Sequence, residues 1–564
     1  MQAALVVKIK WFAALECAAY ARWAPRVSGA FEGALAATFI EDIGKESEAA
    51  LETYDSMLDW LQQLPDEQAS RAPELSQPGV RGVLDAARAL ATENADESAT
   101  LRALRTMHDH LIALPPGHGY PLARRVAVGA ILRARVGRGG GGARPLSGEA
   151  QAVVDSILLR LFGTHKASTE AKGLVQFFHI SKSGGTNMCM AAESNGCTTE
   201  GFDERVNCLI RRFWDEPRWA TFATHKMVQY SAGNRTARPW YVNFGRQRRN
   251  ENETSCQQRA EYLRQMRWNF HANEFTTPRG EPVCKQFVNV IMFRDPIARL
   301  RSQISWIQKL YKGVYNGSDV SAVFRGRTSL FWERLVPAAV NNYYIRSLLG
   351  PRFFEPPLPP INTTHVQQAL LEVLQHDLLL VLERKAYTDA VLRVGLGWRS
   401  SIGDDRVRSS GDLLDEVAMP IDYEKLKARN APDVEVQRLA VSVQALDVLL
   451  FNFVAAIDAA SPGALLPRAP PPCGFVAAAG VAALGWPGAG ARAGASPDDG
   501  AARADATGNA AGVGVAAAPA VVTSASDVAD AIARARAVAG AAALPENAVG
   551  GLAGVAGTQA AGRT

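Results

Sequence analysis

Apolar residues follow a helical period through the first part of the chain. Leu51, Tyr54, Leu58 and Leu61 are three or four residues apart, and this spacing returns each side chain to the same face of an α-helix. The same period recurs over residues 101–111. The pattern therefore predicts a helical amino-terminal region.

A different pattern begins near residue 150. Short apolar runs of strand length alternate there with longer helical periods, which is typical of an α/β domain on a mostly parallel sheet flanked by helices. The expected strands are 173–180, 287–293 and 377–383, and the expected helices include 298–311, 364–376 and 434–457.

Composition divides the 564 residues into four regions. Residues 1–136 form the helical region, 137–150 a glycine-rich linker, 151–460 the α/β domain and 461–564 an Ala/Gly-rich tail. The tail has too few large apolar side chains to offset the loss of chain entropy, so we expect most of it to be disordered. The first region shows no recognisable chemistry, which suits a stem, oligomerisation helices or a packing collar.

Charge is modest overall but unevenly spread. The formal net charge is +5, whereas residues 205–270 hold 13 Lys or Arg against 5 Asp or Glu. A basic surface of this kind suits an acidic substrate or cofactor. A solvated surface stretch is the alternative interpretation.

The cysteines bear on the compartment. Five of the seven lie between residues 189 and 284, and none has C-x-x-C spacing, so a zinc site or a thioredoxin-like motif is unsupported. The clustering fits one or two disulfides in an oxidising compartment. Four N-x-[ST] sequons, the glycosylation acceptors of secreted proteins, lie at Asn234, Asn252, Asn316 and Asn362. Together these features favour a secretory lumen.

Targeting is not settled by the amino end. Lys8 and Lys10 precede "WFAALECAAYA", which resembles a signal with a charged head, but Glu16 interrupts its apolar part. A helix of the mature protein explains the stretch equally well. Membrane anchoring is not evident, because no clean apolar run reaches about 18 residues.

One short stretch, "FFHISKSGGTNM" (177–188), joins an apolar run to a small polar turn. Its two glycines allow a tight turn whose backbone N–H groups point at an oxyanion. Lys182 adds a charge and Thr186 a hydroxyl donor. The pattern predicts a strand that ends in an anion-binding loop at a helix amino terminus.

In a Walker A motif the lysine follows the last glycine. Here it precedes both glycines, which argues against a nucleotide kinase.

A second motif follows another expected strand. "FVNVIMFRDPIARLRSQISW" (287–306) places Arg294-Asp295-Pro296 directly after the apolar run, with Arg299 and Ser302 on the next helix. Arginine can hold phosphate oxygens in a bidentate fork, proline suits a helix start, and Asp295 is placed to fix the loop or cap the helix.

In this order, 112 residues apart, the two motifs resemble the cofactor site of sulfotransferases that use 3′-phosphoadenylyl sulfate (PAPS). The carbohydrate branch of that family typically reads H-I-P-K-T-G-G-T in its phosphosulfate loop, and residues 179–186 read H-I-S-K-S-G-G-T. Ser183 keeps the hydroxyl of the usual threonine. Ser181 replaces the proline, which we expect to loosen the turn without removing a donor. The family's 3′-phosphate motif is likewise a strand, R-D-P, then arginine and serine on a helix.

The resemblance extends over about residues 172–457, half of the chain. Segments 341–350, 369–398 and 445–453 are similar to later family segments, with Phe451 where tyrosine is usual. The similarity is closest to Golgi enzymes such as the heparan sulfate 2-O- and 6-O-sulfotransferases. It implies a P-loop-type sheet, PAPS without a metal, and the Golgi lumen or membrane. The residues it implies in cofactor binding are Lys182, Ser183, Gly184, Gly185, Thr186, Asn187, Arg294 and Ser302.

The implied activity is sulfuryl transfer from PAPS to a carbohydrate hydroxyl. Lys182 would serve the leaving phosphate oxygen. His225 is the expected base, because it sits where this branch carries a histidine at the end of a strand, and an imidazole suits that task near neutral pH. His179, which alternation directs into the fold, and Glu193 are rival bases.

Several alternatives stay open. The acceptor can be a small molecule, a lipid or tyrosine instead of a glycan, or the fold can be a non-catalytic module that binds PAPS or a glycan. Arg246, Arg248 and Arg249 suit an anionic polysaccharide or a solvated loop. Nothing in the sequence indicates nucleic-acid binding or a metal-ligand cluster.

Overall fold

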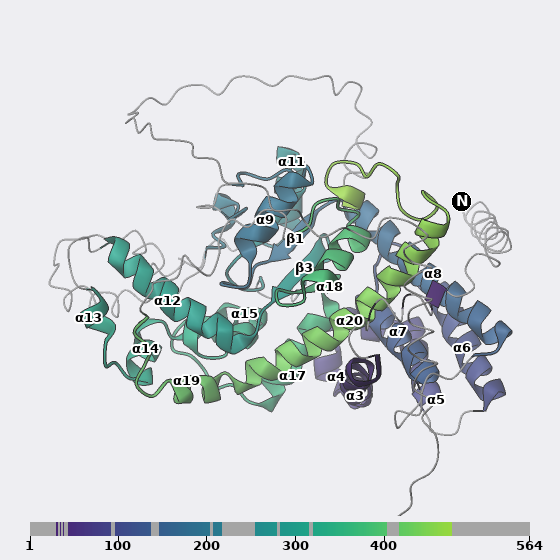
Figure 1. Cartoon of the computed structure of the whole chain (residues 1–564), viewed down its shortest axis with the longest axis horizontal. Helices are drawn as coiled ribbons and strands as arrows, with labels where there is room; N and C mark the ends of the chain where they lie inside the picture. Colours follow the sequence, from purple (N-terminus) through teal and green to yellow (C-terminus); the bar gives the residue numbers. More distant parts are fainter. Residues whose placement is uncertain are drawn as a thin grey trace, which may run out of the picture. The chain divides into compact units, whose positions relative to one another are not determined.

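A computed structural model describes most of the chain up to residue 476 (Figure 1). The chain divides into two units, Met1–Ala489 and Gly490–Thr564, and all described residues belong to the first. The described residues are 30, 31, 34, 38, 43–91, 96–136, 146–202, 207–216, 254–278, 283–314, 320–402 and 417–476. Most of the predicted tail therefore lies outside them.

A small parallel sheet organises the second half of the described chain. Its strand order is β2-β1-β3-β4, and every pairing is parallel. Their bounds are Val175–Phe178 for β1, Phe270–Asn273 for β2, Val288–Phe293 for β3 and Leu378–Val381 for β4. All strand residues are buried, as expected for a parallel sheet covered on both faces. The prediction of a parallel sheet is confirmed, although the protein is mostly helical.

Three of the four strands were predicted from their apolar runs. β2 was not, because its sequence, FHAN, places the polar His271 and Asn273 at buried positions. The side chain of Asn273 accepts from the N–H of Phe275 at 3.0 Å and donates to the carbonyl of Thr276 at 2.9 Å. Buried polar groups are tolerated when they are bonded in this way.

Helices follow β1, β3 and β4, and those after β3 match the predictions closely. The expected helices 298–311, 364–376 and 434–457 are α12 (Pro296–Val314), α17 (Thr363–Gln375) and α20 (Ala431–Ala460). The other elements of this part are α9 (Gly185–Ser194), α11 (Cys256–Met266), α13 (Val320–Phe324), α14 (Ser329–Leu335), α15 (Tyr343–Leu349), α16 (Pro351–Phe354), α18 (Lys385–Ala390), α19 (Tyr423–Arg429) and the short turns η2 (Arg211–Phe213), η5 (Ala338–Val340), η6 (Val391–Gly395) and η8 (Gly474–Val476).

Helix α20 is long and apolar enough to cross a membrane, but 78% of its apolar window is buried inside the protein. It packs against β4, α17 and α18. That environment is typical of the core helix of a globular fold.

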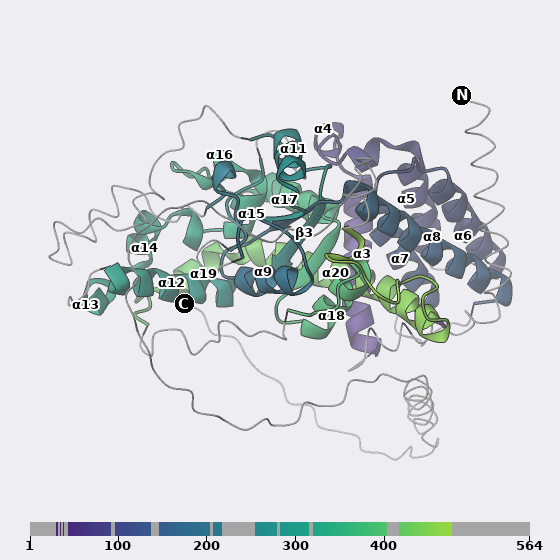
Figure 2. The ribbon, with the colours of Figure 1, turned by 90° about the horizontal axis from the view of Figure 1, so that it is seen from above.

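The amino-terminal region is helical and shares the core of the α/β part. Helices α5 to α8 pack against one another (Figure 2), and α3, α7 and α8 also contact α20. One contiguous apolar cluster includes residues from Ala30 to Val476. The elements of this region are α3 (Ile43–Gln62), α4 (Asp66–Ala69), η1 (Pro73–Ser76), α5 (Pro78–Ala91), α6 (Glu97–Ile112), α7 (Pro121–Val136) and α8 (Gly148–Lys172).

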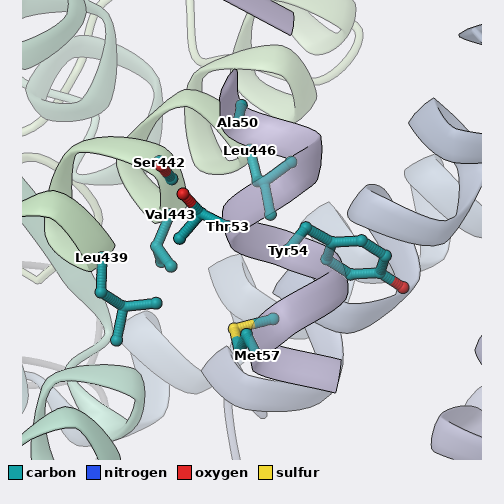
Figure 3. Close-up of a pocket in the computed structure, with 8 residues that line it drawn as sticks. All are labelled: Ala50, Thr53, Tyr54, Met57, Leu439, Ser442, Val443 and Leu446. Carbon is teal, nitrogen blue, oxygen red and sulfur yellow. The ribbon is translucent and has the colours of Figure 1, made fainter. Parts of the chain in front are cut away.

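A shallow pocket between α3 and α20 shows how this contact is made (Figure 3). Tyr54 points away from α20 and donates its hydroxyl to the carbonyl of Val126 on α7, at 3.0 Å. None of the lining side chains is charged, and they are Ala50, Thr53, Tyr54, Met57, Leu439, Ser442, Val443 and Leu446. The pocket is a packing feature without reactive groups.

Two buried arginines fasten α7 to α20. Arg124 and Arg125 both bond the carboxylate of Asp447, with Nη2 to Oδ1 at 3.0 Å and Nη2 to Oδ2 at 2.7 Å. All three side chains are at most 1% exposed. The charge pattern of α7 gave no indication that these arginines would be buried.

Three disulfides cross-link the α/β part, and they join Cys189 to Cys208, Cys197 to Cys473 and Cys256 to Cys284. Two of them lie within the cluster of five cysteines between residues 189 and 284, as the sequence predicted. The third was not predicted, because Cys473 had been assigned to the tail. Cys473 and Phe475 are buried, and η8 packs on α8. The folded part therefore extends beyond the predicted boundary at residue 460.

These bonds support a prediction about the compartment. We expect peptide mapping of the native protein under non-reducing conditions to recover Cys197 linked to Cys473, because such a bond persists only in an oxidising environment. Glycosidase treatment should also shift its gel mobility, since Asn362 is exposed at the start of α17. Free thiols at these cysteines, with no mobility shift, would point to the cytosol or a plastid.

Candidate functional site

The β1–α9 loop, residues 179–184, turns sharply between a buried strand and a helix. Gly184 adopts φ +87° and caps α9, and Lys182 adopts φ +70°. A Cβ on Gly184 would lie 3.0 Å from both Leu382 Cδ1 and Met292 Sδ, so that position needs glycine for its conformation and for space. The first N–H groups of α9, which have no partner within the helix, therefore open beyond the carboxyl end of β1. This geometry suits an oxyanion.

The second motif follows β3 as the sequence predicts. Asp295 caps α12, because its Oδ1 accepts from the N–H of Ala298 at 2.6 Å. Ser302 lies one turn further on and is 7% exposed. Arg299 faces the core: its guanidinium lies 4.4 Å from the ring centroid of Tyr343 and donates to the carbonyl of Ala339. Burial lowers the pKa of Arg299.

The fold brings the two motifs into direct contact. Because β1 and β3 are neighbours (Figure 1), Arg294 Nη1 donates to the carbonyl of Lys182 at 3.0 Å. Arg294 Nε also lies 3.9 Å from Glu383 Oε1, just after β4. The hydroxyl of Tyr344 bonds the Arg294 carbonyl at 2.5 Å. A guanidinium and a helix amino terminus thus share one edge of the sheet.

Lys182 itself lies over α12. Its Nζ is 4.2 Å from the ring centroid of Trp306, a distance at which the ring face attracts an ammonium group. The side chain is half-buried. Lys182 and Arg294 are therefore two cationic residues, one in the loop that precedes α9 and the other bonded to that loop.

The remaining predicted loop residues differ in their surroundings. The hydroxyl of Thr186 donates to Asn207 Oδ1 at 3.0 Å. Ser183 is fully buried and Asn187 is half-buried. Gly185 lies against the ring of His179, since a Cβ there would be 1.8 Å from His179 Nε2.

The candidate bases are only partly described. His179 is buried, as alternation predicted, and its ring stacks on Phe177. Glu193 is exposed in the last turn of α9. The preferred base, His225, lies outside the described residues, as do Arg246, Arg248 and Arg249.

Sequence reasoning missed Glu274, a buried carboxylate directly after β2. Its Oε1 accepts from the hydroxyl of Ser181 at 2.6 Å, and its Oε2 lies 3.4 Å from His179 Nδ1. Nothing in the sequence indicated that Ser181, which we expected to loosen the turn, would bond a buried carboxylate. Alternation of apolar and polar residues over 268–273 was the available indication of the strand before it.

Within the described ranges, no group of three His, Cys, Asp or Glu side chains is arranged to hold a metal ion. Comparison with protein-family models, curated proteins and solved structures finds no match.

Proposed function

We propose that this protein is a PAPS-dependent sulfotransferase that acts on a carbohydrate hydroxyl. The observation that carries the proposal is the contact between Arg294 and the Lys182 carbonyl, which unites two phosphate-type motifs from distant parts of the chain. They meet where parallel strands end, the usual place for ligands of open α/β sheets. The motif order and the similarity in sequence point to PAPS among nucleotides.

Each end of the cofactor has candidate partners. The backbone N–H groups of residues 184–186 would hold the 5′-phosphate, with the dipole of α9 behind them. Arg294 and Ser302 would hold the 3′-phosphate, because a guanidinium fork matches phosphate oxygens. Lys182, on its flexible stem, would leave Trp306 and contact the oxygen between phosphorus and sulfur.

PAPS supplies the sulfuryl group. In the transfer an acceptor oxygen bonds to sulfur, the bond from sulfur to the phosphate oxygen breaks, and the hydroxyl proton passes to a base, for which His225 is our candidate. Charge gathers on the departing phosphate oxygen, so the ammonium group of Lys182 in contact with that oxygen would supply much of the rate. The basic stretch with Arg246, Arg248 and Arg249 would suit an anionic polysaccharide, and we propose the Golgi lumen or membrane as the location.

The direct test is incubation of the protein with radiolabelled PAPS and a panel of sulfated and unsulfated glycans. Label in a glycan would support the proposal. Label only in a small molecule, a lipid or tyrosine would keep the reaction but reject the acceptor. Binding of the product nucleotide, 3′-phosphoadenosine 5′-phosphate (PAP), without transfer to any acceptor would indicate a binding module.

The cofactor assignment makes a prediction for Arg294→Ala. We expect its affinity for PAP, measured by calorimetry, to fall about 10- to 100-fold, because a hydrogen bond to a charged group contributes roughly 1.5–3 kcal/mol. Arg294→Lys keeps the positive charge but loses the bidentate guanidinium, so its PAP affinity should lie between those of the wild type and Arg294→Ala. Arg438→Ala, on the exposed side of α20, is the control. Unchanged affinity in a folded Arg294→Ala protein would reject the assignment.

A further inference from the structure

A buried carboxylate stands behind the β1–α9 loop. Glu274 follows the last residue of β2, at the same sheet edge as the loop, because β2 pairs with β1 in parallel. Its side chain is 7% exposed. A carboxylate this far from water needs specific partners, and the loop supplies two of them.

The first partner is Ser181, which immediately precedes Lys182. Its hydroxyl donates to Glu274 Oε1 at 2.6 Å, a short bond of the kind made to a charged acceptor. The second partner is His179, whose Nδ1 lies 3.4 Å from Glu274 Oε2. The opposite side of the same ring lies against Gly185, the first residue of α9. Glu274 therefore reaches both ends of the segment that carries Lys182.

Glu274 is itself fixed in place. Its N–H donates to the carbonyl of Asp215 at 3.1 Å, and the carboxylate of Asp215 forms a buried ion pair with Arg259 on α11. The side chain of Asn273 shapes the turn that follows, through its bonds to Phe275 and Thr276. The backbone of Glu274 is thus fixed at the end of β2 by its bond to Asp215, so its carboxylate is not carried on a free loop.

We propose that Glu274 is a positioning residue that sets the shape of the β1–α9 loop through Ser181 and His179. This chain has serine where the sulfotransferases it resembles have proline, and the bond to Glu274 supplies the rigidity that the ring would give. The proposal rests on the proposed function. Glu274 does not serve as the base, because both of its oxygens face loop side chains.

The test measures PAP affinity by calorimetry, and KM for PAPS and kcat by transfer of label, in Ser181→Ala, Glu274→Ala and the double variant. Each single change should weaken PAP binding and raise KM about tenfold with little change in kcat. The double variant should be no worse than Glu274→Ala alone, because Ser181→Ala removes a bond that Glu274→Ala has already removed. Glu274→Gln keeps an acceptor for Ser181 and should recover part of the affinity. Glu261→Gln, an exposed glutamate on α11, is the matched control.

A second readout separates this inference from the proposed function. Hydrogen exchange of peptides covering residues 179–188 should speed up in Glu274→Ala and stay at the wild-type rate in Glu261→Gln, whatever nucleotide binds. If the wild-type protein binds no PAP but this difference appears, the proposed function fails and the positioning role stands. Additive losses in the double variant would overturn the role. A second result would also overturn the positioning role: a kcat about 100-fold lower or more in Glu274→Gln, with PAP affinity unchanged. A loss of that size is typical of a missing general base and would assign that task to Glu274.

Discussion

Lys182→Ala is expected to lower kcat by about 10²–10³-fold, because removal of one fixed donor to a developing oxyanion has an effect of that size. PAP binding should weaken as well, since Lys182 would also contact the phosphate before reaction. Single-turnover transfer of label, combined with calorimetry, measures both effects. Lys309→Ala is the matched control: its Nζ lies 5.9 Å from the centroid of the same Trp306 ring, but it is exposed and outside the loop. Full activity in Lys182→Ala would contradict the proposed mechanism.

The contrast with His225→Ala identifies the base. If His225 takes the hydroxyl proton, that change should lower kcat by about 10²–10⁴-fold and leave PAP affinity nearly unchanged. Lys182→Ala should disturb both quantities. An active His225→Ala protein, together with loss of activity in Glu193→Ala or His179→Ala at unchanged PAP affinity, would place the base elsewhere.

Apolar runs were sufficient to predict β1, β3 and β4, because a strand buried on both faces must be apolar along its length. β2 was not predicted, although residues 268–273 alternate between apolar and polar, because the burial of its polar side chains depends on contacts with distant parts of the chain. The ring of His271 packs edge-on against Phe213 and Phe287, and burial lowers its pKa to about 3. The side chain is therefore neutral at pH 7 and can occupy the core.

The two motifs of the candidate site could be predicted from the sequence, as β1, β3 and β4 could. Patterns of glycine and lysine, or R-D-P, that follow a strand indicate candidate anion loops. The pairing of β1 with β3 then brings Lys182 and Arg294 together. Glu274 carries no motif, since its role depends on the pairing of β2 with β1. Arg299, which the sequence places on the helix after Arg294, faces the core, with its guanidinium 4.4 Å from the ring centroid of Tyr343.

The glycine-rich stretch illustrates a related point. A glycine-rich stretch between two helical patterns indicates a linker, yet the helices on either side of it share one core. Arg124 finds its partner Asp447 323 residues along the chain. Charged residues are almost never fully buried unless they are paired. The pair cannot be predicted from the sequence, because it forms only when α7 and α20 pack together.

This pairing leads to the largest expected effect on stability. Asp447→Asn should lower the free energy of unfolding by about 3–5 kcal/mol, because it leaves two buried guanidinium groups without their counter-charge. Burial already lowers the pKa of Arg125, and the Asp447 carboxylate opposes that shift. Chemical denaturation followed by tryptophan fluorescence measures the change. The control is Glu149→Gln, which breaks the exposed pair with Arg105 and should alter stability by less than about 1 kcal/mol.

The same reasoning predicts the outcome of a deletion. A fragment covering residues 146–476 would lack both arginine partners of Asp447 and would expose the apolar face of α20 that α3 and α7 cover. We therefore expect it to remain insoluble or to unfold without a cooperative transition, even though it contains both anion motifs. Cooperative melting of this fragment near the temperature of the full chain, with PAP binding intact, would show that the amino-terminal helices are a separable region. Equal stability of Asp447→Asn and Glu149→Gln would lead to the same conclusion from the ion pair alone.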